Sequence, residues 1–376
     1  MGTPHPRHTR NALVNEGWAL PVALQPDELL SSWLARAALT QGCDPLVLTG
    51  SIWPSWRVWA RDPDRGLSKA QVDALASVSG IDTSTLHTTS LRTTAATIAR
   101  GPLESYAIWP WILAQGTRNR MRHGGLQYCP ICLKEDGKPY FRRQWRLAWH
   151  TGCVKHGVLL ADRCTHCHAP LEPHRLSAED GHLARCATCV SDLRQVDTLP
   201  VVESALTFQN TADDVLTTGV GVYGTTQLSP ADWFELSRYF LTILRKASLT
   251  QSGKLRALIR ELGINSVQLN PPATGLPLEL LPVGERMQLL SALWRLLSAG
   301  PEGFRAATHA ALLTRGYLHH TKQPVPASVL TLLESLPGQI GIGSYPARDK
   351  SGAPRSKQTV MRMHARLLRR MNAASR

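Results

Sequence analysis

The chain reads C-P-I-C at residues 129–132, C-V-K-H at 153–156, C-T-H-C at 164–167 and C-A-T-C at 186–189, and these four motifs decide how it is organised. Each motif places two potential metal ligands three positions apart. That is the spacing of a zinc knuckle, in which one tight turn offers two soft ligands to a single ion. Eight ligands are enough for two closed tetrahedral sites, so the sequence predicts two zinc ions.

The eight ligands can be paired in two ways. In the sequential pairing, the first site consists of Cys129, Cys132, Cys153 and His156, and the second of Cys164, Cys167, Cys186 and Cys189. A crossed pairing, in which the first motif joins the third and the second joins the fourth, is also compatible with the spacing. The sequential pairing is favoured, because both closing loops then have the length of roughly twenty residues that is usual between zinc knuckles.

Disulfides are the alternative interpretation of these cysteines. The sequence opens with no signal-peptide pattern, so we expect a reducing compartment, where disulfides are rare. His156, at the position of a fourth cysteine, also fits a metal site better than a disulfide ladder. Closed sites leave no position for water, so the zinc is expected to be structural and not catalytic. Four nearby histidines are expected to be surface or supporting groups and not ligands: His150, His166, His168 and His174.

The composition points to a polyanionic partner. The chain has 376 residues, enough for two or three domains, and a net charge of +14 with neutral histidines. Nucleic acid is the first partner that such an excess suggests, and an anionic membrane surface the second. No run approaches the roughly eighteen apolar residues of a membrane-spanning helix. We therefore expect a cytoplasmic, nucleoid-associated protein, with the remaining cysteine, Cys43, as a small buried apolar residue.

The predicted fold class is mainly α: an N-terminal helix-turn-helix region, two small tandem zinc-finger modules with minor β content, and a C-terminal all-α bundle. The expected divisions are a basic arm at 1–17, a helical domain at 18–123, the zinc fingers at 124–190, a connection at 191–228, a helical domain at 229–345 and a basic tail at 346–376.

Residues 67–91 have the pattern of a helix-turn-helix. Ser68 can cap a first helix, Gly80 can end it, and a second helix is expected from Asp82 to about Leu91. If this second helix enters a major groove, the candidate DNA contacts are Thr83, Ser84, Thr85, His87 and Arg92. The helix is poor in Arg and Lys, which weakens the case for base reading. The alternative is an ordinary pair of packed helices that touches no DNA.

Two groups of arginines are further candidate DNA contacts. Arg118, Arg120 and Arg122 precede the first knuckle, and Arg142, Arg143 and Arg146 alternate with aromatic residues between the first two knuckles. Basic and aromatic residues together can combine phosphate contact with base stacking. In the alternative, the aromatic residues pack on the zinc core and the arginines lie in solvent.

Other helices are expected from their caps and apolar spacing. One should begin at Pro26, with Arg36 on its polar side, and another at Ser229-Pro230. Further helices are expected at about 254–262, 285–298, 302–315 and 326–336, and an amphipathic basic segment from about 358.

The residues from Leu20-Pro21 through Glu28 to Arg36 resemble the opening of TniQ/TnsD proteins. So does the stretch from Arg146 to Leu171, which reads R-L-A-W-H, then the second and third knuckles. This resemblance covers about residues 18–190. It implies a helix-turn-helix with tandem zinc fingers, and a part in heteromeric transposons. There, family members link target DNA or an RNA-guided CRISPR effector complex, on which some dock as dimers, to an AAA+ ATPase.

The functional prediction is therefore a non-catalytic transposition adaptor whose partners are double-stranded DNA, an AAA+ transposition ATPase and, as further options, a CRISPR effector complex and a second copy of the chain. A stand-alone sequence-specific transcription factor is the alternative. A zinc-dependent nuclease or hydrolase is disfavoured, because the sequence shows no cluster of Asp, Glu and His with an open metal position.

Overall fold

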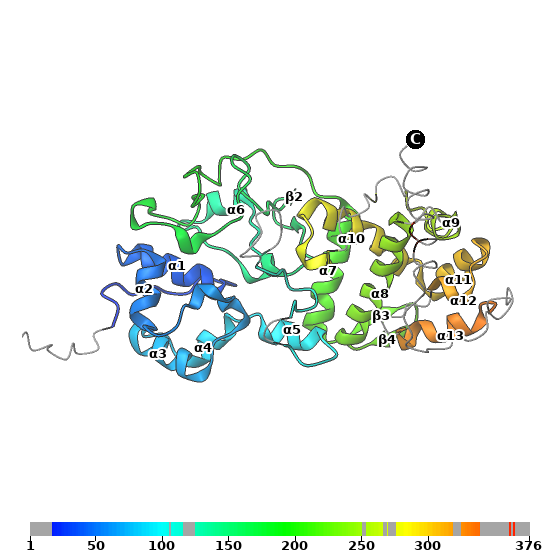
Figure 1. The fold of residues 1–376 in the computed structure, drawn as a ribbon, viewed down its shortest axis with the longest axis horizontal. Coiled ribbons are helices and arrows are strands. Elements are labelled where there is room, and N and C mark those ends of the chain that lie inside the picture. The colour runs from blue at the N-terminus through cyan, green and yellow to red at the C-terminus, as the bar shows by residue number, and fades with distance from the viewer. Residues whose placement is uncertain are drawn as a thin grey trace, which may run out of the picture. The chain divides into compact units, whose positions relative to one another are not determined.

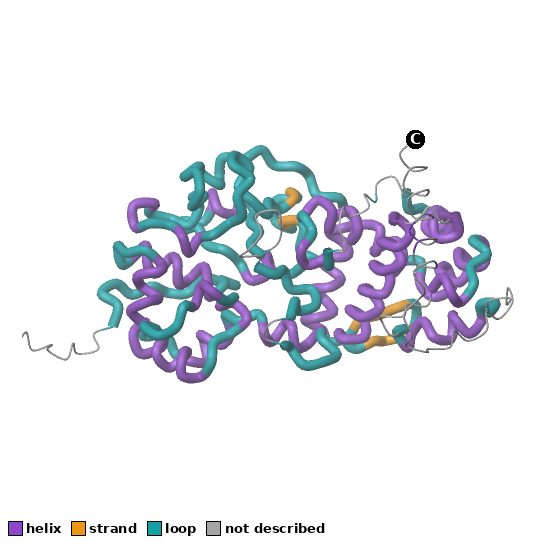
Figure 2. The backbone as a smooth tube through the Cα atoms, in the orientation of Figure 1, coloured by secondary structure: helices purple, strands orange, loops and turns teal. Residues whose placement is uncertain are grey.

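The computed structural model describes residues 17–104, 107–115, 125–249, 253–265, 269, 276–318, 325–338, 361 and 364. Helices dominate this part of the chain, and long loops and short strands connect them (Figures 1 and 2). The mainly helical class is confirmed, with two Cys/His groups between N-terminal and C-terminal helices.

The N-terminal elements are α1 (Leu30–Thr40), α2 (Pro45–Ile52), η1 (Val58–Ala60), η2 (Pro63–Arg65), α3 (Lys69–Ser79), α4 (Thr83–Thr88) and α5 (Arg92–Ile98). The predicted start and end of α3 are confirmed: Ser68 and Gln71 form a capping box, and Gly80 takes a left-handed φ of 70°. The second helix is shorter than predicted. It ends at Thr88, because the chain turns there and begins α5, where the hydroxyl of Ser90 accepts the backbone N–H of Arg92.

The predicted start of the first helix at Pro26 was wrong, and so was the position of Arg36. Residues 28 and 29 are extended and bonded to the segment at 141–142, so α1 begins at Leu30. Arg36 is buried, and its Nη2 lies 2.6 Å from the carboxylate of Glu28, whose side chain is also buried. The basic group therefore ties two parts of the core together instead of facing solvent.

The zinc-finger region consists mostly of turns. Its elements are α6 (Pro130–Glu135), η3 (Arg143–Arg146), η4 (Pro173–Arg175), η5 (Ala178–Asp180) and two short antiparallel strands, β1 (Gly152–Cys153) and β2 (Val158–Leu159). Cys153 pairs with Val158 in this hairpin, so the strands position the second knuckle. The minor β content matches the prediction.

The segment at 191–228, predicted as a connection, instead contains α7 (Glu203–Thr218) and the hairpin of β3 (Gly221–Tyr223) with β4 (Thr226–Leu228). The buried face of α7 is thin, since Ala205, Phe208, Ala212 and Val215 are separated by many Thr and Asp residues. The helix packs against α10, which supplies the apolar surface that α7 lacks on its own.

The C-terminal helices are α8 (Pro230–Leu249), α9 (Gly253–Glu261), α10 (Val283–Ser298), α11 (Gly300–Ala310), α12 (Arg315–Leu318) and α13 (Ala327–Ser335), with η6 (Leu278–Leu280) before α10. Ser229 caps α8 as predicted, because its hydroxyl accepts the backbone N–H of Asp232 at 3.2 Å. Among the described helices, none is long and apolar enough to cross a membrane. The basic arm, apart from Gly17, and the basic tail, apart from Met361 and His364, lie outside the described residues.

One hydrophobic core joins the zinc-finger region to the C-terminal helices. Trp111 and Trp149 pack on Phe234 of α8, with ring centroids 5.4 and 5.0 Å apart. Phe208 of α7 stacks on Trp233 of α8 at 5.4 Å. Buried aromatic rings contribute strongly to stability through their large apolar area. Residues on both sides of the predicted boundaries at 190 and 229 therefore belong to the same core.

Candidate metal centres

The first group of ligands is closely gathered. The Nδ1 atom of His156 lies 3.3 Å from the sulfur of Cys129 and 3.4 Å from the sulfurs of Cys132 and Cys153. The sulfurs of Cys132 and Cys153 are 3.6 Å apart. The three cysteines are buried, and the imidazole is partly covered. Nδ1 is therefore the histidine atom that faces the sulfurs.

The second group has the same dimensions. The sulfurs of Cys164 and Cys189 are 3.7 Å apart, and those of Cys167 and Cys186 are 3.6 Å apart. These separations are far too long for a disulfide, in which the sulfurs are about 2.05 Å apart. In each group, all four ligand atoms lie within 4.8 Å of one another.

Both groups fit a tetrahedral metal ion. Ligands that lie about 2.3 Å from a zinc ion at tetrahedral angles are separated by roughly 3.8 Å when both are sulfur, and by slightly less when one is nitrogen. The observed separations of 3.3–3.7 Å are close to these values. Within the described part of the chain, the ligands group in the sequential arrangement and not in the crossed one.

Three of the four knuckles close in the same way. The residue four positions after the first cysteine takes a left-handed φ: 66° at Gly157, 57° at His168 and 61° at Val190. In each case its N–H donates to the carbonyl of that first cysteine, at 2.8, 3.0 and 2.8 Å. Glycine adopts this conformation freely, but for valine it is strained. The turn at Val190 is therefore maintained by its surroundings.

The first knuckle closes differently. Its chain continues into α6, where Pro130 occupies the first turn and the N–H of Leu133 donates to the carbonyl of Cys129. The N–H of Cys132 points at the sulfur of Cys129, at 3.5 Å. Such N–H···S contacts favour the thiolate form that binds a metal ion.

Two polar residues support the ligands. Glu135 accepts from the Nε2 of His156 at 3.0 Å and from Lys155 at 2.5 Å. The hydroxyl of Ser191 lies 3.0 Å from the sulfur of Cys189, and its hydrogen bond lowers the pKa of that thiol to about 5. Both contacts favour the metal-binding forms of the ligands.

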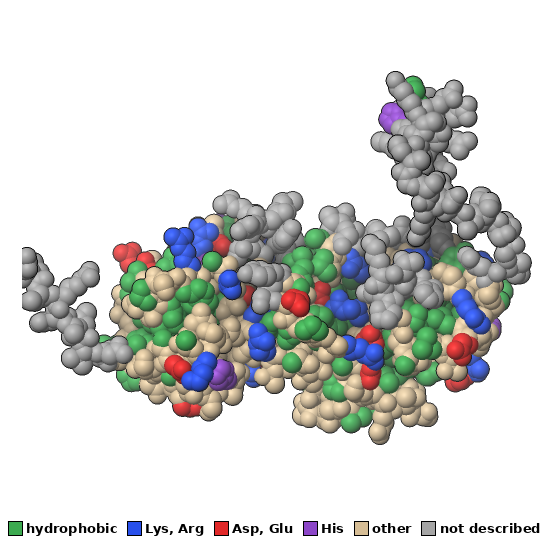
Figure 3. All heavy atoms as spheres, turned by 60° about the horizontal axis from the view of Figure 1, so that its bottom comes forward, with side chains coloured by type: hydrophobic (Ala, Val, Ile, Leu, Met, Phe, Trp, Pro, Cys, Tyr) green, Lys and Arg blue, Asp and Glu red, His purple; other side chains and the backbone are tan. Residues whose placement is uncertain are grey.

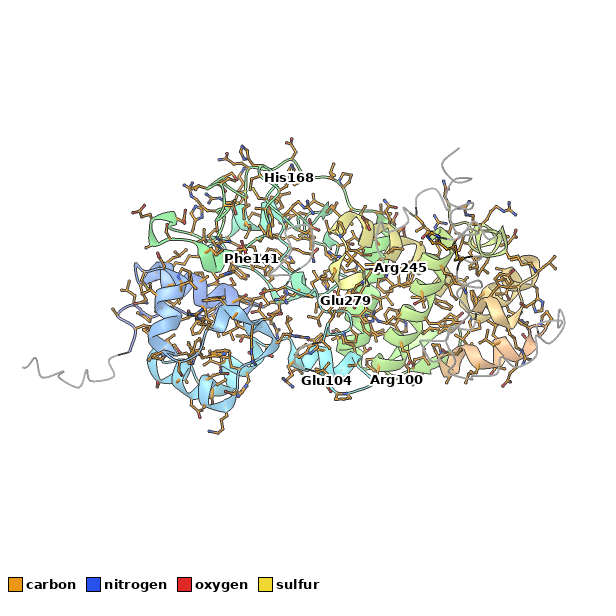
Figure 4. All side chains as sticks on the ribbon, in the orientation of Figure 1. Arg100, Glu104, Phe141, His168, Arg245 and Glu279 are labelled. Carbon is orange, nitrogen blue, oxygen red and sulfur yellow. The ribbon has the colours of Figure 1, made fainter. Side chains whose placement is uncertain are left out.

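The other histidines lie outside both groups, as predicted. His150 is buried, and its Nε2 lies 2.9 Å from the carboxylate of Asp213. His174 stacks on Trp59 with ring centroids 5.2 Å apart. His166 and His168 are exposed, and Figure 4 shows His168 at the outer edge of the zinc-finger loops.

The second finger docks on the N-terminal helices. Besides the stacking of His174 on Trp59, the carboxylate of Asp44, just before α2, accepts the backbone N–H of Ala178 at 2.8 Å. The turns η4 and η5 pack against α1. The fold of the second ligand group therefore bears directly on the position of α1 and α2.

The structure contradicts one of the predicted DNA contacts. The side chain of Arg146 is completely buried, and its two Nη atoms contact Asp62 at 2.5 Å and Asp64 at 2.7 Å. Burial and these two carboxylates fix Arg146 inside the protein, so it offers no surface to a phosphate. The acids responsible lie more than eighty residues earlier in the chain.

Arg142 and Arg143 also have partners within the protein. Arg142 is mostly buried, lies above the rings of Tyr140 and Trp145, and pairs with Asp136 at 2.8 Å. Arg143 pairs with Asp27 at 3.0 Å and retains a side-chain exposure of 35%. The aromatic residues between the knuckles thus pack in the core, and Arg143 keeps the larger accessible surface of the two.

The remaining candidates are dispersed. Arg118, Arg120 and Arg122 lie outside the described residues. Thr83, Ser84, His87 and Arg92 are exposed, and Thr85 is half-buried, with its backbone N–H bonded to the cap residue Asp82. On the face drawn in Figure 3, described Lys and Arg side chains lie in several separate groups with acidic residues among them.

Sequence reasoning missed a buried polar network that crosses the shared core. Arg286 of α10 is fully buried and donates to the carbonyl of Ala148 at 2.7 Å and to the side-chain oxygen of Gln127 at 2.5 Å. Burial lowers the pKa of Arg286 to about 10. Glu279, just before α10, accepts the backbone N–H of Trp111 at 2.7 Å and also contacts Arg238 of α8. Figure 4 shows Glu279 within this central region.

Comparison with protein-family models found one match. Residues 19–160, less than half of the chain, match the TniQ family model, and a TniQ domain indicates a transposition-associated protein family. The matched segment includes α1 to α6 and the complete first ligand group, and it ends before the second. No curated protein matched the chain.

Proposed function

We propose that this chain is a non-catalytic TniQ-family targeting adaptor of DNA transposition. It would link target DNA, or an RNA-guided CRISPR effector complex, to an AAA+ transposition ATPase. The observation that carries the proposal is the TniQ match over residues 19–160, in which the N-terminal helices and the first metal centre share contacts. A second copy of the chain and association with the nucleoid belong to the same proposal.

The two metal ions are proposed to be zinc. The donor sets of three sulfurs with one imidazole nitrogen, and of four sulfurs, are those of structural zinc. Loops such as 161–200 bury few large apolar side chains of their own, and bound metal supplies folding free energy to such modules. Zinc would therefore fix the surfaces that α1, α2 and the loops present to partners.

DNA contact is proposed to be mainly electrostatic. A net charge of +14 favours a polyanion, and Arg143 together with the arginines at 118, 120 and 122 is the proposed source of phosphate contacts. Binding of this kind falls steeply as the salt concentration rises. Recognition of a particular target would then come from the assembled complex more than from this chain.

The described acidic residues support a non-catalytic role. Strand cutting with hard cations needs carboxylates gathered around an open site. Near the fingers, Asp136 pairs with Arg142, Asp192 pairs with Arg194, and Glu135 contacts Lys155 and His156. Each of these carboxylates is engaged by a basic partner.

A reconstituted transposition reaction tests the proposal. The purified chain, an AAA+ transposition ATPase and a transposase from the same transposon, donor DNA and target DNA are combined, and insertion is measured with each protein omitted in turn. Insertion at the target site should require this chain, which should also bind the ATPase in a direct pull-down. The chain alone should neither nick plasmid with magnesium or manganese nor hydrolyse ATP.

The transcription-factor alternative gives the opposite pattern. It predicts tight, sequence-specific binding to an isolated duplex that persists at elevated salt, with no binding to the ATPase. That result, or nicking that follows this chain through purification, would refute the adaptor proposal.

A further inference from the structure

A cavity of about 190 Å³ lies between the N-terminal helices. Its apolar lining comes from Leu30 of α1, Leu67 before α3, Val72 of α3 and Leu86 of α4. Leu30, Val72 and Leu86 are nearly fully buried, so the apolar wall is part of the core and does not depend on a mobile side chain. A cavity of roughly 150 Å³ with such a lining is large enough for benzene.

The opening of the cavity is polar and cationic. His87, Ser90, Arg92 and Thr93 line it, and all of these except Ser90 are exposed. The guanidinium of Arg92 lies 5.6 Å from the ring of Trp109, and Arg65 lies above the same ring at 4.1 Å. Within the described residues, no carboxylate lies at ion-pair distance from Arg92. An apolar chamber therefore opens beside a cation that has no anionic partner in the part of the chain that the structure describes.

We propose that this cavity is a docking site for a partner protein segment that inserts one aliphatic or aromatic side chain and places an adjacent carboxylate against Arg92. The apolar lining selects the inserted side chain, and the cation selects the acid. This inference does not depend on the adaptor role, since it follows from the shape and charge of the site alone.

The surroundings favour a peptide over DNA as the occupant. Base reading relies on side chains such as Arg, Lys, Asn and Gln, whereas the exposed residues of α4 are Thr83, Ser84, His87 and Thr88. The residues at the opening could donate to a phosphate, but the four aliphatic residues behind them have no side-chain donor, so a phosphate would leave the apolar chamber unfilled. The surface predicted from the sequence as a DNA-reading helix is thus better suited to a hydrophobic side chain.

The test uses the zinc-loaded full-length protein with ¹³C-labelled Leu and Val methyl groups. The probe is the blocked tetrapeptide acetyl-Gly-Phe-Asp-Gly-amide at millimolar concentration, followed by methyl NMR. The methyl resonances of Leu67, Val72 and Leu86 should shift on titration. Thr93→Trp, at the opening, should abolish the shifts, whereas the matched variant Thr97→Trp, one turn further along α5 and also exposed, should retain them.

The charge contact is tested separately. Arg92→Gln should weaken peptide binding about fivefold, and the control Lys69→Gln should not, because a single exposed ion pair contributes up to about 1 kcal/mol. A peptide with Asn in place of Asp should bind the unaltered protein about fivefold more weakly and should bind Arg92→Gln no more weakly than the original peptide does.

Several outcomes would overturn the proposal. One is the absence of methyl shifts in the unaltered protein, and another is equal loss of binding in Thr93→Trp and Thr97→Trp. A third is a duplex DNA probe that shifts the same methyl groups and loses binding in Thr93→Trp, which would assign the surface to DNA.

Discussion

The Oε2 atom of Glu135 lies 3.0 Å from the Nε2 of His156, on the side of the imidazole opposite the three cysteine sulfurs. Since Nδ1 faces the sulfurs, Nε2 carries the hydrogen and donates it to this carboxylate. A carboxylate in this position fixes the orientation of a ligating histidine and makes it a stronger donor to the metal. Lys155, which donates to the same oxygen, lowers the pKa of Glu135 and keeps it ionised.

Glu135→Ala should therefore weaken zinc binding at the first centre by about tenfold, the lower end of the range for such supporting residues because Glu135 is largely exposed. Competition with a chromophoric chelator measures the affinity of each centre. Glu179→Ala, at another exposed acid in the finger region, is the control. Equal zinc affinities of the two variants would show that Glu135 does not support the metal centre.

Metal content should follow the two ligand groups. The unaltered protein should contain two zinc ions per chain by elemental analysis, and Cys164→Ser should contain one or fewer and lose soluble yield, because binding and folding of the module are coupled. Cys43→Ser is the matched control, since Cys43 lies outside both groups, and it should retain two ions. A single ion in the unaltered protein would contradict the assignment.

Arg286→Met should lower the free energy of unfolding by about 2 kcal/mol. The substitution removes the donors from Gln127, Ala148 and Leu281, and each buried acceptor left unpaired costs about 1–3 kcal/mol. Removing a buried cation offsets part of this loss. Urea denaturation measures the difference, with Arg295→Met, at an exposed position on the same helix, as a control within about 0.5 kcal/mol of the unaltered protein.

Val190→Gly should stabilise the second finger slightly, by up to about 1 kcal/mol. The left-handed conformation costs valine about 1–2 kcal/mol, and glycine relieves this strain. The greater conformational freedom of glycine in the unfolded chain lowers the stability by about 0.5–1 kcal/mol, so the net gain is small. Thermal unfolding of the zinc-loaded protein gives the comparison. Val196→Gly, six residues later, should instead destabilise the protein, and a larger loss at position 190 than at 196 would disprove the strain argument.

Features that depend on neighbouring residues were predictable from the sequence. Ser68 and Gly80 bound α3, and Ser229 caps α8, because capping acts over three or four residues. The ligands were found for the same reason, because two donors three positions apart define a turn. The structure adds which turns come together around each site. The helices α9, α10, α11 and α13 were found from their apolar spacing, whereas the short helix α12 was not predicted and α11 ends five residues earlier than expected.

Features that depend on partners distant in the sequence could not be predicted. Arg146 follows Trp145 in a segment typical of a nucleic-acid contact, and only the fold reveals that Asp62 and Asp64 enclose it. The helix α7 buries Gln209, whose side chain bonds to the backbone of residues 151 and 152, a contact that no local pattern indicates. Contacts between residues close in the sequence could thus be predicted, whereas the pairing of charges between distant residues in the core could not.

The hydrogen bonds of Arg286 cross the boundary of the segment that matches the family model. The family match ends at residue 160, yet the carbonyl of Ala148 and the side chain of Gln127 lie within that match and take their donor from α10. A recombination event that attached residues 19–160 to a different C-terminal half would have to bring an equivalent guanidinium to the same place. Without such a donor, the carbonyl of Ala148 and the side-chain oxygen of Gln127 would lose a buried hydrogen-bond partner, so the segment at 19–160 depends for its stability on residues that the family model does not include.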